Sequence, residues 1–307
     1  MKTLLIINPH SRGGKSYKTA QKAMKYLEEK NYEFGHIIIE HFDDACRLSY
    51  RANLEGVDRI IAVGGDGTIN KVANGFFDDR GKKISNSVFG VIYSGTSPDF
   101  CKSYGIPTDV HAACDVLING NHTEIPVGMV QFQNNSADKT KIFLCCANIG
   151  LGASLARKAN SGIRKYFGDF TGTFMSLLQL LIKFRGANYE VIMQGSFHEF
   201  KNVLNLSLGI TEYIASGIKI NRGINDSGNE LYLLKTANIN AGNIFGLIRK
   251  IYSGKEFKNC DYLSLEYVEE IEIRNSTINN EVEFDGDPAG ILPCRIRIAP
   301  DRLRLLN

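Results

Sequence analysis

The feature that most constrains the fold is an apolar run followed at once by a glycine-rich loop, at residues 60–70. Ile60-Ile61-Ala62-Val63 is short and partly β-branched, which is typical of a buried parallel strand. The glycines after it permit a sharp turn and leave backbone N–H groups accessible before a helix begins near Thr68. Because N–H groups at a helix N-terminus bind anions, the pattern predicts a phosphate-binding loop. The loop residues are Gly64, Gly65, Asp66, Gly67 and Thr68.

A carboxylate lies in the middle of this loop, at Asp66. A carboxylate repels phosphate groups unless a cation such as Mg²⁺ lies between them, so the loop favours a site for a nucleotide with its metal ion. The alternative is a tight strand-to-helix turn in which Asp66 is an acidic N-cap. That interpretation explains one or two glycines, but not three around a carboxylate.

A second polar loop, from Asn8 to Lys15, follows a predicted buried strand at 3–7. Loops at the carboxyl ends of neighbouring parallel strands meet at one crevice, so this loop and the glycine loop should face the same ligand. Lys15 could contact a phosphate as a point charge, or it could be a solvated lysine at a helix start. Asn8 could hydrogen-bond the nucleotide or the adjoining loop.

A third polar loop follows the predicted strand 88–92. Its Gly95 can supply a backbone N–H group and its Thr96 a hydroxyl, while Asp99 adds a second carboxylate to the crevice. A helix N-cap role for Ser97 or Asp99 is the alternative, and Pro98 suits a helix start. The two interpretations are compatible with each other.

Strands alternate with helices over the first 123 residues, which predicts an open, doubly wound parallel sheet. Beyond this point the pattern is mainly β, and the period-two alternation at 265–274 is typical of an antiparallel sheet with one face in water. We therefore expect an α/β domain at 1–123 and a β-rich domain at 124–298, with 299–307 as a segment that could return to the first domain. The expected strands of the second domain are a hairpin within 124–148 and the segments 189–197, 200–211, 229–237, 262–274, 278–285 and 294–298.

A helical insertion is expected at about 161–186, within the β-rich domain. Its apolar side chains between Phe174 and Phe184 could line an acyl groove or rest on a bilayer, but a helix packed on the sheet is the simpler interpretation. Three polar residues interrupt this segment, so it is too short to span a membrane.

Composition narrows the classes of partner. Lys and Arg number 36 against 33 Asp and Glu, a bias too small to indicate nucleic-acid binding but compatible with contact to an anionic membrane. The seven cysteines are scattered and form no Cys-x-x-Cys pair, which fits a reducing cytoplasm better than a disulfide framework or a zinc site. We expect a soluble or peripheral protein. The sequence leaves the oligomeric state open, with a homodimer among the options.

An acidic pair lies late in the β-rich half, where Asp285 and Asp287 flank Gly286 at the end of a predicted strand. Phosphoryl transfer to a hydroxyl usually needs one carboxylate that takes the hydroxyl proton, and Asp285 could be that base. Asp287 could orient the site or hold metal. The alternative is an ordinary Asp-Gly turn between two strands.

Taken together, these loops resemble the diacylglycerol kinase catalytic-domain family, especially its soluble bacterial lipid kinases; the family also includes sphingosine and ceramide kinases. The resemblance covers nearly the whole chain. It rests on Asn8-Pro9 with Gly14-Lys15, on residues 64–70 followed by Asn74-Gly75, on Gly95-Thr96-x-x-Asp99-Phe100, and on Asp285-Gly286.

The resemblance implies a nucleotide domain, a C-terminal antiparallel β-sandwich-like domain and an active site between them. It implies an ATP- and Mg²⁺-dependent lipid kinase that acts on a diacylglycerol-like lipid at a membrane surface. In family terms the residues from Gly64 to Thr68 bind ATP phosphates, and Asp66 and Asp99 belong to an acidic network linked to Mg²⁺. Asp285 corresponds to the general base. Asp226 resembles a residue of the family's structural metal site, although an extra residue interrupts that motif.

Three departures from the family pattern are visible. Pro98 stands where the family usually has Asn, Pro126 stands near the domain crossover in place of an aspartate, and Asp287 replaces a glutamate. The first two remove polar groups from the expected network, so an altered substrate or a reduced activity is consistent with them. One alternative function is therefore a nucleotide- or lipid-binding pseudokinase. A second is an NAD kinase, whose glycine loop looks the same.

Overall fold

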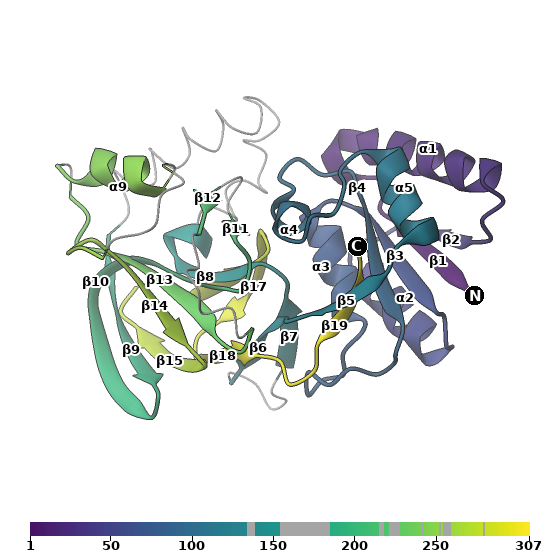
Figure 1. Ribbon diagram of the computed structural model, residues 1–307. Helices are drawn as coiled ribbons and strands as arrows, with labels where there is room; N and C mark the ends of the chain where they lie inside the picture. Colours follow the sequence, from purple (N-terminus) through teal and green to yellow (C-terminus); the bar gives the residue numbers. More distant parts are fainter. Residues whose placement is uncertain are drawn as a thin grey trace. The chain divides into compact units, whose positions relative to one another are not determined.

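The fold is that of a computed structural model, which describes residues 1–133, 139–153, 185–214, 218–220, 228–240, 242–251, 253, 259–278 and 280–307 (Figure 1). The chain divides into two compact units. Unit 1 comprises Met1–Val127 and Ala299–Asn307, and unit 2 comprises Gly128–Ile298. Each unit has its own sheet and its own apolar core.

Unit 1 is built on a six-stranded sheet in the order β2-β1-β3-β4-β19-β5. The pairs β1–β2, β1–β3, β3–β4 and β4–β19 are parallel, and β5 is antiparallel to β19. The C-terminal strand therefore joins the sheet of unit 1. The strands are β1 (Thr3–Ile7), β2 (Gly35–Ile38), β3 (Arg59–Gly64), β4 (Val88–Tyr93), β5 (His122–Ile125) and β19 (Leu303–Leu306).

Helices cover both faces of this sheet (Figure 1). On one face α1 and α5 pack their small apolar residues against Leu5, Ile7 and Val63, which are fully buried. On the other face α2 and α3 pack together against β1 and β3. Each fully buried Leu, Ile or Val side chain contributes about 1.5–3 kcal/mol to folding. The helices are η1 (Ser11–Gly14), α1 (Lys15–Glu29), α2 (Asp44–Leu54), α3 (Asp66–Asn74), α4 (Asp99–Ser103) and α5 (Val110–Asn119).

This arrangement confirms the doubly wound parallel sheet expected from the sequence. One boundary differs from expectation. The helix after the glycine loop begins at Asp66 rather than near Thr68, because Gly65 is its N-cap and an acidic residue is favourable in the first turn.

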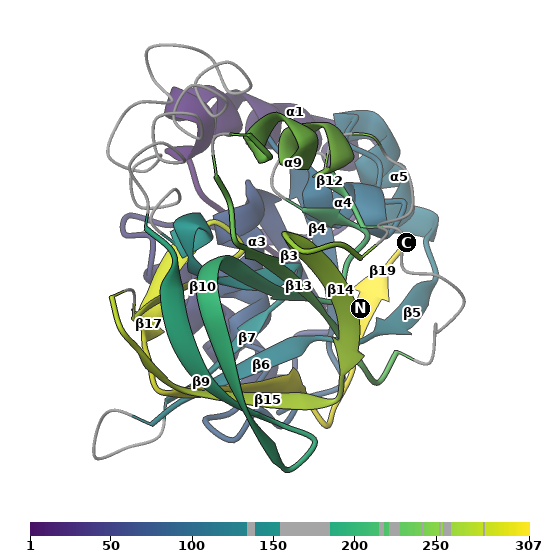
Figure 2. The same ribbon diagram turned by 90° about the vertical axis from the view of Figure 1, so that its left-hand side faces the viewer.

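Unit 2 contains an eleven-stranded antiparallel sheet within the described residues. Its main path runs β17-β16-β8-β10-β9-β15-β18-β6-β7, and β13 joins β10 to β14. Figure 2 shows the long β9–β10 hairpin curving beside β13 and β15. The strands are β6 (Gly128–Phe132), β7 (Lys139–Phe143), β8 (Cys146–Gly150), β9 (Ala187–Met193), β10 (Ser196–Gly209), β13 (Leu231–Ala237), β14 (Leu263–Val268), β15 (Glu270–Ser276), β16 (Glu281–Phe284), β17 (Asp287–Ile291) and β18 (Cys294–Ile298).

The two ends of this path pack against each other around one core. The rings of Phe143 on β7 and Phe284 on β16 lie 6.3 Å apart, and Lys141 donates to the Ala289 carbonyl at 3.0 Å. The sheet thus folds over a large apolar core, and unit 2 has a second, smaller apolar cluster that includes Tyr232, Leu234 and Leu247. A two-stranded ribbon, β11 (Tyr213–Ile214) with β12 (Ile218–Lys219), and the helix α9 (Ile244–Ile251) complete the described elements.

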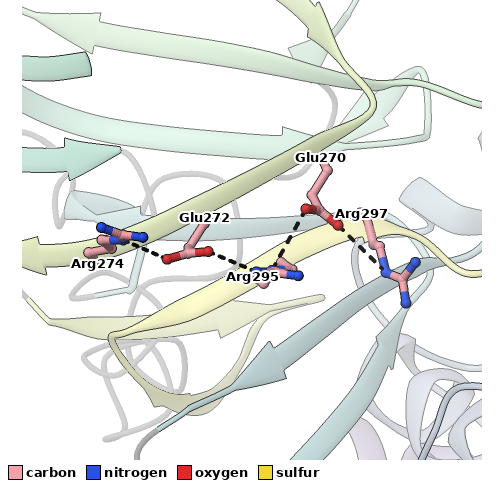
Figure 3. Close-up of polar contacts among 5 residues, drawn as sticks. All are labelled: Glu270, Glu272, Arg274, Arg295 and Arg297. Carbon is pink, nitrogen blue, oxygen red and sulfur yellow. Dashed lines mark hydrogen bonds and ion pairs between the residues drawn. The ribbon is translucent and has the colours of Figure 1, made fainter. Parts of the chain in front are cut away.

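The outward face of β15 and β18 carries a ladder of alternating charges (Figure 3). Glu272 lies between Arg274, at 2.6 Å, and Arg295, at 2.9 Å. Glu270 lies 3.7 Å from Arg295 and 3.9 Å from Arg297. The opposite face of β15 is apolar, which confirms the period-two pattern predicted for this strand.

Several expected elements of the second half differ in detail. The segment 262–274 forms two strands, β14 and β15, which are separated at Glu269 and pair with different neighbours. β17 was not predicted, because its Pro288 and Gly290 disfavour a strand. It lies at an end of the path, where proline is tolerated. Residues 134–138 of the expected hairpin and most of the helical insertion at 161–186 lie outside the described residues. Among the residues that are described, no helix is long and apolar enough to cross a membrane.

Candidate active site

The loops after β1, β3 and β4 are joined by backbone hydrogen bonds in unit 1. The Asn8 N–H donates to the Val63 carbonyl at 3.0 Å, and the Ser94 N–H donates to the Gly64 carbonyl at 2.8 Å. The three polar loops predicted to share one edge of the sheet therefore do so. This is the edge at which ligands bind in open α/β sheets.

The glycine loop and the Gly95 loop approach closely. A Cβ atom on Gly95 would lie 2.6 Å from the Tyr93 hydroxyl and 2.8 Å from the Gly65 Cα atom, closer than van der Waals contact permits. Gly65 is in turn the N-cap of α3 and caps it with no side-chain hydrogen bond. No capping side chain therefore occupies the first N–H groups of α3, and this arrangement lets a phosphate approach them.

Asn8 connects the first loop to the second. Its Nδ2 atom donates to the Thr68 hydroxyl at 2.9 Å, and its Oδ1 atom accepts from the His10 N–H group at 3.0 Å; both Asn8 and Thr68 are buried. Of the two roles considered for Asn8, the structure shows the bond to the adjoining loop. Lys15 is the first residue of α1, and its side chain is outside what the structure describes.

Asp66 accepts a hydrogen bond from a residue that the sequence analysis missed. The Tyr93 hydroxyl donates to Asp66 Oδ2 at 3.0 Å, and Tyr93 is buried. Burial, together with the negative charge of Asp66, raises the pKa of the Tyr93 phenol, so the phenol stays a neutral donor. Tyr93 closes the strand before the Gly95 loop, and only the fold brings it to the carboxylate.

Asp99 is the first residue of α4 and is buried, with the Ser97 hydroxyl donating to its Oδ2 atom at 3.1 Å. The N-cap of α4 is Pro98, and it makes no side-chain cap bond, so neither Ser97 nor Asp99 is the N-cap. Thr96 is exposed in the same loop. The described residues contain no group of three or more His, Cys, Asp or Glu side chains that could hold a metal ion by themselves.

In unit 2 the acidic pair surrounds a tight hairpin turn between β16 and β17. Asp285 and Gly286 have φ angles of 52° and 89°, so the Asp-Gly turn considered for this stretch is present. The Asp285 carboxylate is nevertheless held in one orientation by three backbone N–H groups. The donors are Leu144 at 2.6 Å, Cys145 at 2.8 Å and Cys146 at 3.2 Å.

A second carboxyl group, absent from the sequence analysis, supports this turn. Glu283 is only 4% exposed, and it accepts hydrogen bonds from the Asn148 side-chain amide and from the Gly286 N–H group, the latter at 3.0 Å. Burial raises the pKa of Glu283 to about 8, and the negative charge of Asp285 adds to the rise. Asp287 begins β17 opposite Phe284, and Asp226 lies outside the described residues.

Comparison with known proteins assigns both halves of the chain. Residues 2–130 match the family model of the diacylglycerol kinase catalytic domain. Residues 146–307 match that of the YegS C-terminal NAD kinase beta sandwich-like domain, and this match alone spans more than half of the chain.

Individual relatives agree with these matches. The diacylglycerol kinases of Staphylococcus aureus strains bovine RF122 / ET3-1 and MRSA252 are each 26% identical over 291 residues, which cover 94% of this chain and 87% of the relative. The crystal structure of a diacylglycerol kinase from Bacillus anthracis str. Sterne superposes with a TM-score of 0.69 at 19% identity, over 99% of this chain and 96% of that one, and so supports the fold. The predicted family is thereby confirmed: the chain belongs to the diacylglycerol kinase catalytic-domain family, with a C-terminal domain of the YegS type.

Proposed function

We propose that this protein is an ATP- and Mg²⁺-dependent lipid kinase that transfers the γ-phosphoryl group to a hydroxyl of a diacylglycerol-like lipid. The observation that carries the proposal is the edge of the unit 1 sheet where the loops of Gly65 and Gly95 meet. There no side chain caps the N-terminus of α3, and the hydrogen bond from Asn8 to Thr68 joins the neighbouring loops. A kinase needs such backbone donors to orient a polyphosphate.

The residues of unit 1 fit ATP phosphates with a magnesium ion. Mg²⁺ is usually held by one or two carboxylates together with phosphate oxygens, rather than by an all-protein cage. Asp66 and Asp99, the first residues of α3 and α4, would hold it. When bound, the ion would neutralise charge on the β- and γ-phosphate oxygens. Lys15, Gly95 and Thr96 stay candidate phosphate ligands.

Asp285 is the proposed general base. A base must be held in a defined orientation to accept a proton from the attacking hydroxyl, and three N–H groups give the Asp285 carboxylate that orientation. The same donors stabilise the ionised carboxylate, which is the form that accepts a proton. Asp287, two residues later, is proposed to orient the acceptor side of the site. A metal role for Asp226 stays a prediction.

The lipid acceptor is inferred from the relatives named diacylglycerol kinase. Such an acceptor is embedded in a membrane, so the proposal includes peripheral contact of the protein with a membrane surface in the cytoplasm. A homodimer stays a prediction. No role in nucleic-acid binding is proposed.

The proposal is tested by incubating the wild-type protein with γ-labelled ATP, Mg²⁺ and single lipids in mixed micelles. The panel comprises diacylglycerol, monoacylglycerol, phosphatidylglycerol, sphingosine and ceramide, with NAD as a separate acceptor. We expect label in diacylglycerol or a close analogue. Transfer of the label to NAD would instead indicate that the protein is an NAD kinase. Tight ATP binding without transfer to any acceptor would indicate a pseudokinase, for which Pro98 in the Asp99 loop supplies a reason.

A further inference from the structure

Glu283 is buried, and core packing alone gives no reason for a carboxyl group at this position. It lies between Val282 and Phe284 on β16 and is almost fully buried. Among the described residues no Lys, Arg or His forms an ion pair with it. Because burying a carboxyl group is unfavourable unless it is hydrogen-bonded, its hydrogen bonds must explain its presence here.

The reason lies in what Glu283 contacts. Its Oε2 atom accepts from the N–H group of Gly286, the residue directly after Asp285. Its Oε1 atom accepts from the side-chain amide of Asn148 on β8. Both oxygens are therefore used as acceptors, one on the turn and one on the neighbouring strand.

The same strand holds the turn from its other side. The Asp285 N–H donates to the Cys146 carbonyl at 3.1 Å, while the Cys146 N–H donates to the Asp285 carboxylate. Asn148 lies two residues further along β8. The turn is thus attached to β8 in two ways. Asp285 is hydrogen-bonded to the Cys146 backbone, and Gly286 is linked to Asn148 through the Glu283 carboxyl group.

A chain of hydrogen bonds fixes which way the Asn148 amide faces. Its Oδ1 atom accepts from the Ser207 hydroxyl and from the Asn205 amide, the latter at 3.3 Å. Asn205 in turn accepts from the Gly152 N–H at 2.7 Å, so its own amide is also fixed. Asn148 therefore presents a donor to position 283, and that position must supply an acceptor.

We infer that Glu283 and Asn148 are positioning residues that hold the Asp285–Gly286 turn, and with it the Asp285 carboxylate, in the orientation that proton removal requires. This inference rests on the proposed role of Asp285. Neither residue touches the reacting atoms; both act through the turn. The arrangement makes a specific demand, an acceptor at position 283 facing a donor at position 148.

Exchange of the two chemical groups tests this demand. In an assay at about pH 9, above the raised pKa of Glu283, Glu283→Gln places its NH₂ group against the Asn148 NH₂ group when its oxygen accepts from the Gly286 N–H group, and Asn148→Asp places a carboxylate against the Glu283 carboxylate. Each single variant opposes like groups, whereas the double variant Asn148→Asp/Glu283→Gln restores a donor facing an acceptor. With ATP and dioleoylglycerol in mixed micelles, we expect kcat to fall about 10- to 100-fold in each single variant and to recover in the double variant.

Two controls separate positioning from general destabilisation. Ile271→Val shortens a fully buried side chain on β15 and costs about 0.5–1.5 kcal/mol of stability, and Glu281→Gln changes a partly buried carboxyl group on the same strand as Glu283. Both should keep the wild-type kcat. The single variants should lower kcat while leaving the KM for ATP within about twofold of the wild-type value. An unchanged kcat in Glu283→Gln would overturn the inference.

Amide hydrogen exchange at Gly286 supplies a readout that needs no lipid. We expect slow exchange in the wild-type protein, exchange about 10-fold faster in each single variant, and slow exchange in the double variant. If the wild-type protein transfers phosphate to no acceptor, the proposed function fails, and the exchange data still decide whether Glu283 and Asn148 hold the turn. Equal exchange in all four proteins would overturn the inference even in an active kinase.

Discussion

Glu283 shows at the residue scale how a single carboxyl group is affected by its surroundings. It accepts two hydrogen bonds, which favour the ionised form, but burial outweighs them and raises its pKa to about 8. A carboxyl group has a pKa of about 4.3 when the chain is unfolded. Between these values the folded protein binds a proton that the unfolded chain releases.

Stability should therefore depend on the protonation of Glu283. Its contribution is fully present below about pH 4 and is lost as the pH rises through about 8, at about 1.4 kcal/mol per pKa unit. Glu283→Gln removes this dependence. We expect the Tm of the variant, relative to the wild-type protein, to rise between pH 5 and pH 8, as measured by calorimetry. A constant Tm difference over this range would contradict the raised pKa.

At the scale of elements, the proposed phosphate site of unit 1 depends on two loops whose backbones lie close together. Gly65 and Gly95 approach each other there, and the Tyr93 hydroxyl also lies close to Gly95. Because the obstructing atoms include backbone, they cannot move aside as the end of a flexible side chain would. The proposed phosphate site therefore requires both loops in this arrangement.

Gly95→Ala should test this site. The added Cβ atom would force the two loops apart, and we expect ATP affinity to fall at least 10-fold, measured by calorimetric titration with Mg²⁺ present. Gly35→Ala is the matched control, since a Cβ atom there would make only ordinary contacts, the nearest at 3.8 Å. Equal ATP affinity in Gly95→Ala and the wild-type protein would show that the close approach is not needed.

The charge ladder on β15 and β18 gives a second prediction at this scale (Figure 3). The hydrogen bonds from Arg274 and Arg295 lower the pKa of Glu272, so its contribution to stability is present above the unfolded pKa and is lost as the pH falls. Glu272→Gln should cost about 1 kcal/mol at pH 7 and close to nothing at pH 3, measured by urea unfolding. An equal cost at both pH values would exclude an ionic contribution.

At the scale of the whole molecule, the local features were readable from the sequence. The run at 60–63 and its glycines predicted β3, its loop and α3, and alternation predicted β15. The family and the fold class are confirmed, because they follow from the order of such segments. The roles of Asp285, Asp287, Asp66 and Asp99 stay predictions.

Contacts between distant residues were not readable. Tyr93 is 27 residues from Asp66, and Glu283 is 135 residues from Asn148. Glu283 was also concealed by its pattern, since Glu281-Val282-Glu283-Phe284 alternates like a strand with one face in water, whereas the structure buries Glu283. Alternation predicts which residues share a face of a strand, but not whether another part of the sheet covers that face.

We propose that ATP binds unit 1 and that the proton acceptor belongs to unit 2, so one variant should lose phosphate transfer while it keeps ATP binding. The most direct measurement compares the wild-type protein with Asp285→Asn, both for phosphate transfer from ATP to dioleoylglycerol in mixed micelles and for the Kd of ATP. We predict that the variant binds ATP within about twofold of the wild-type protein and loses about 10²–10⁴-fold in kcat. Equal kcat values in the two proteins would contradict the role of Asp285, and no transfer by the wild-type protein would contradict the proposed lipid kinase.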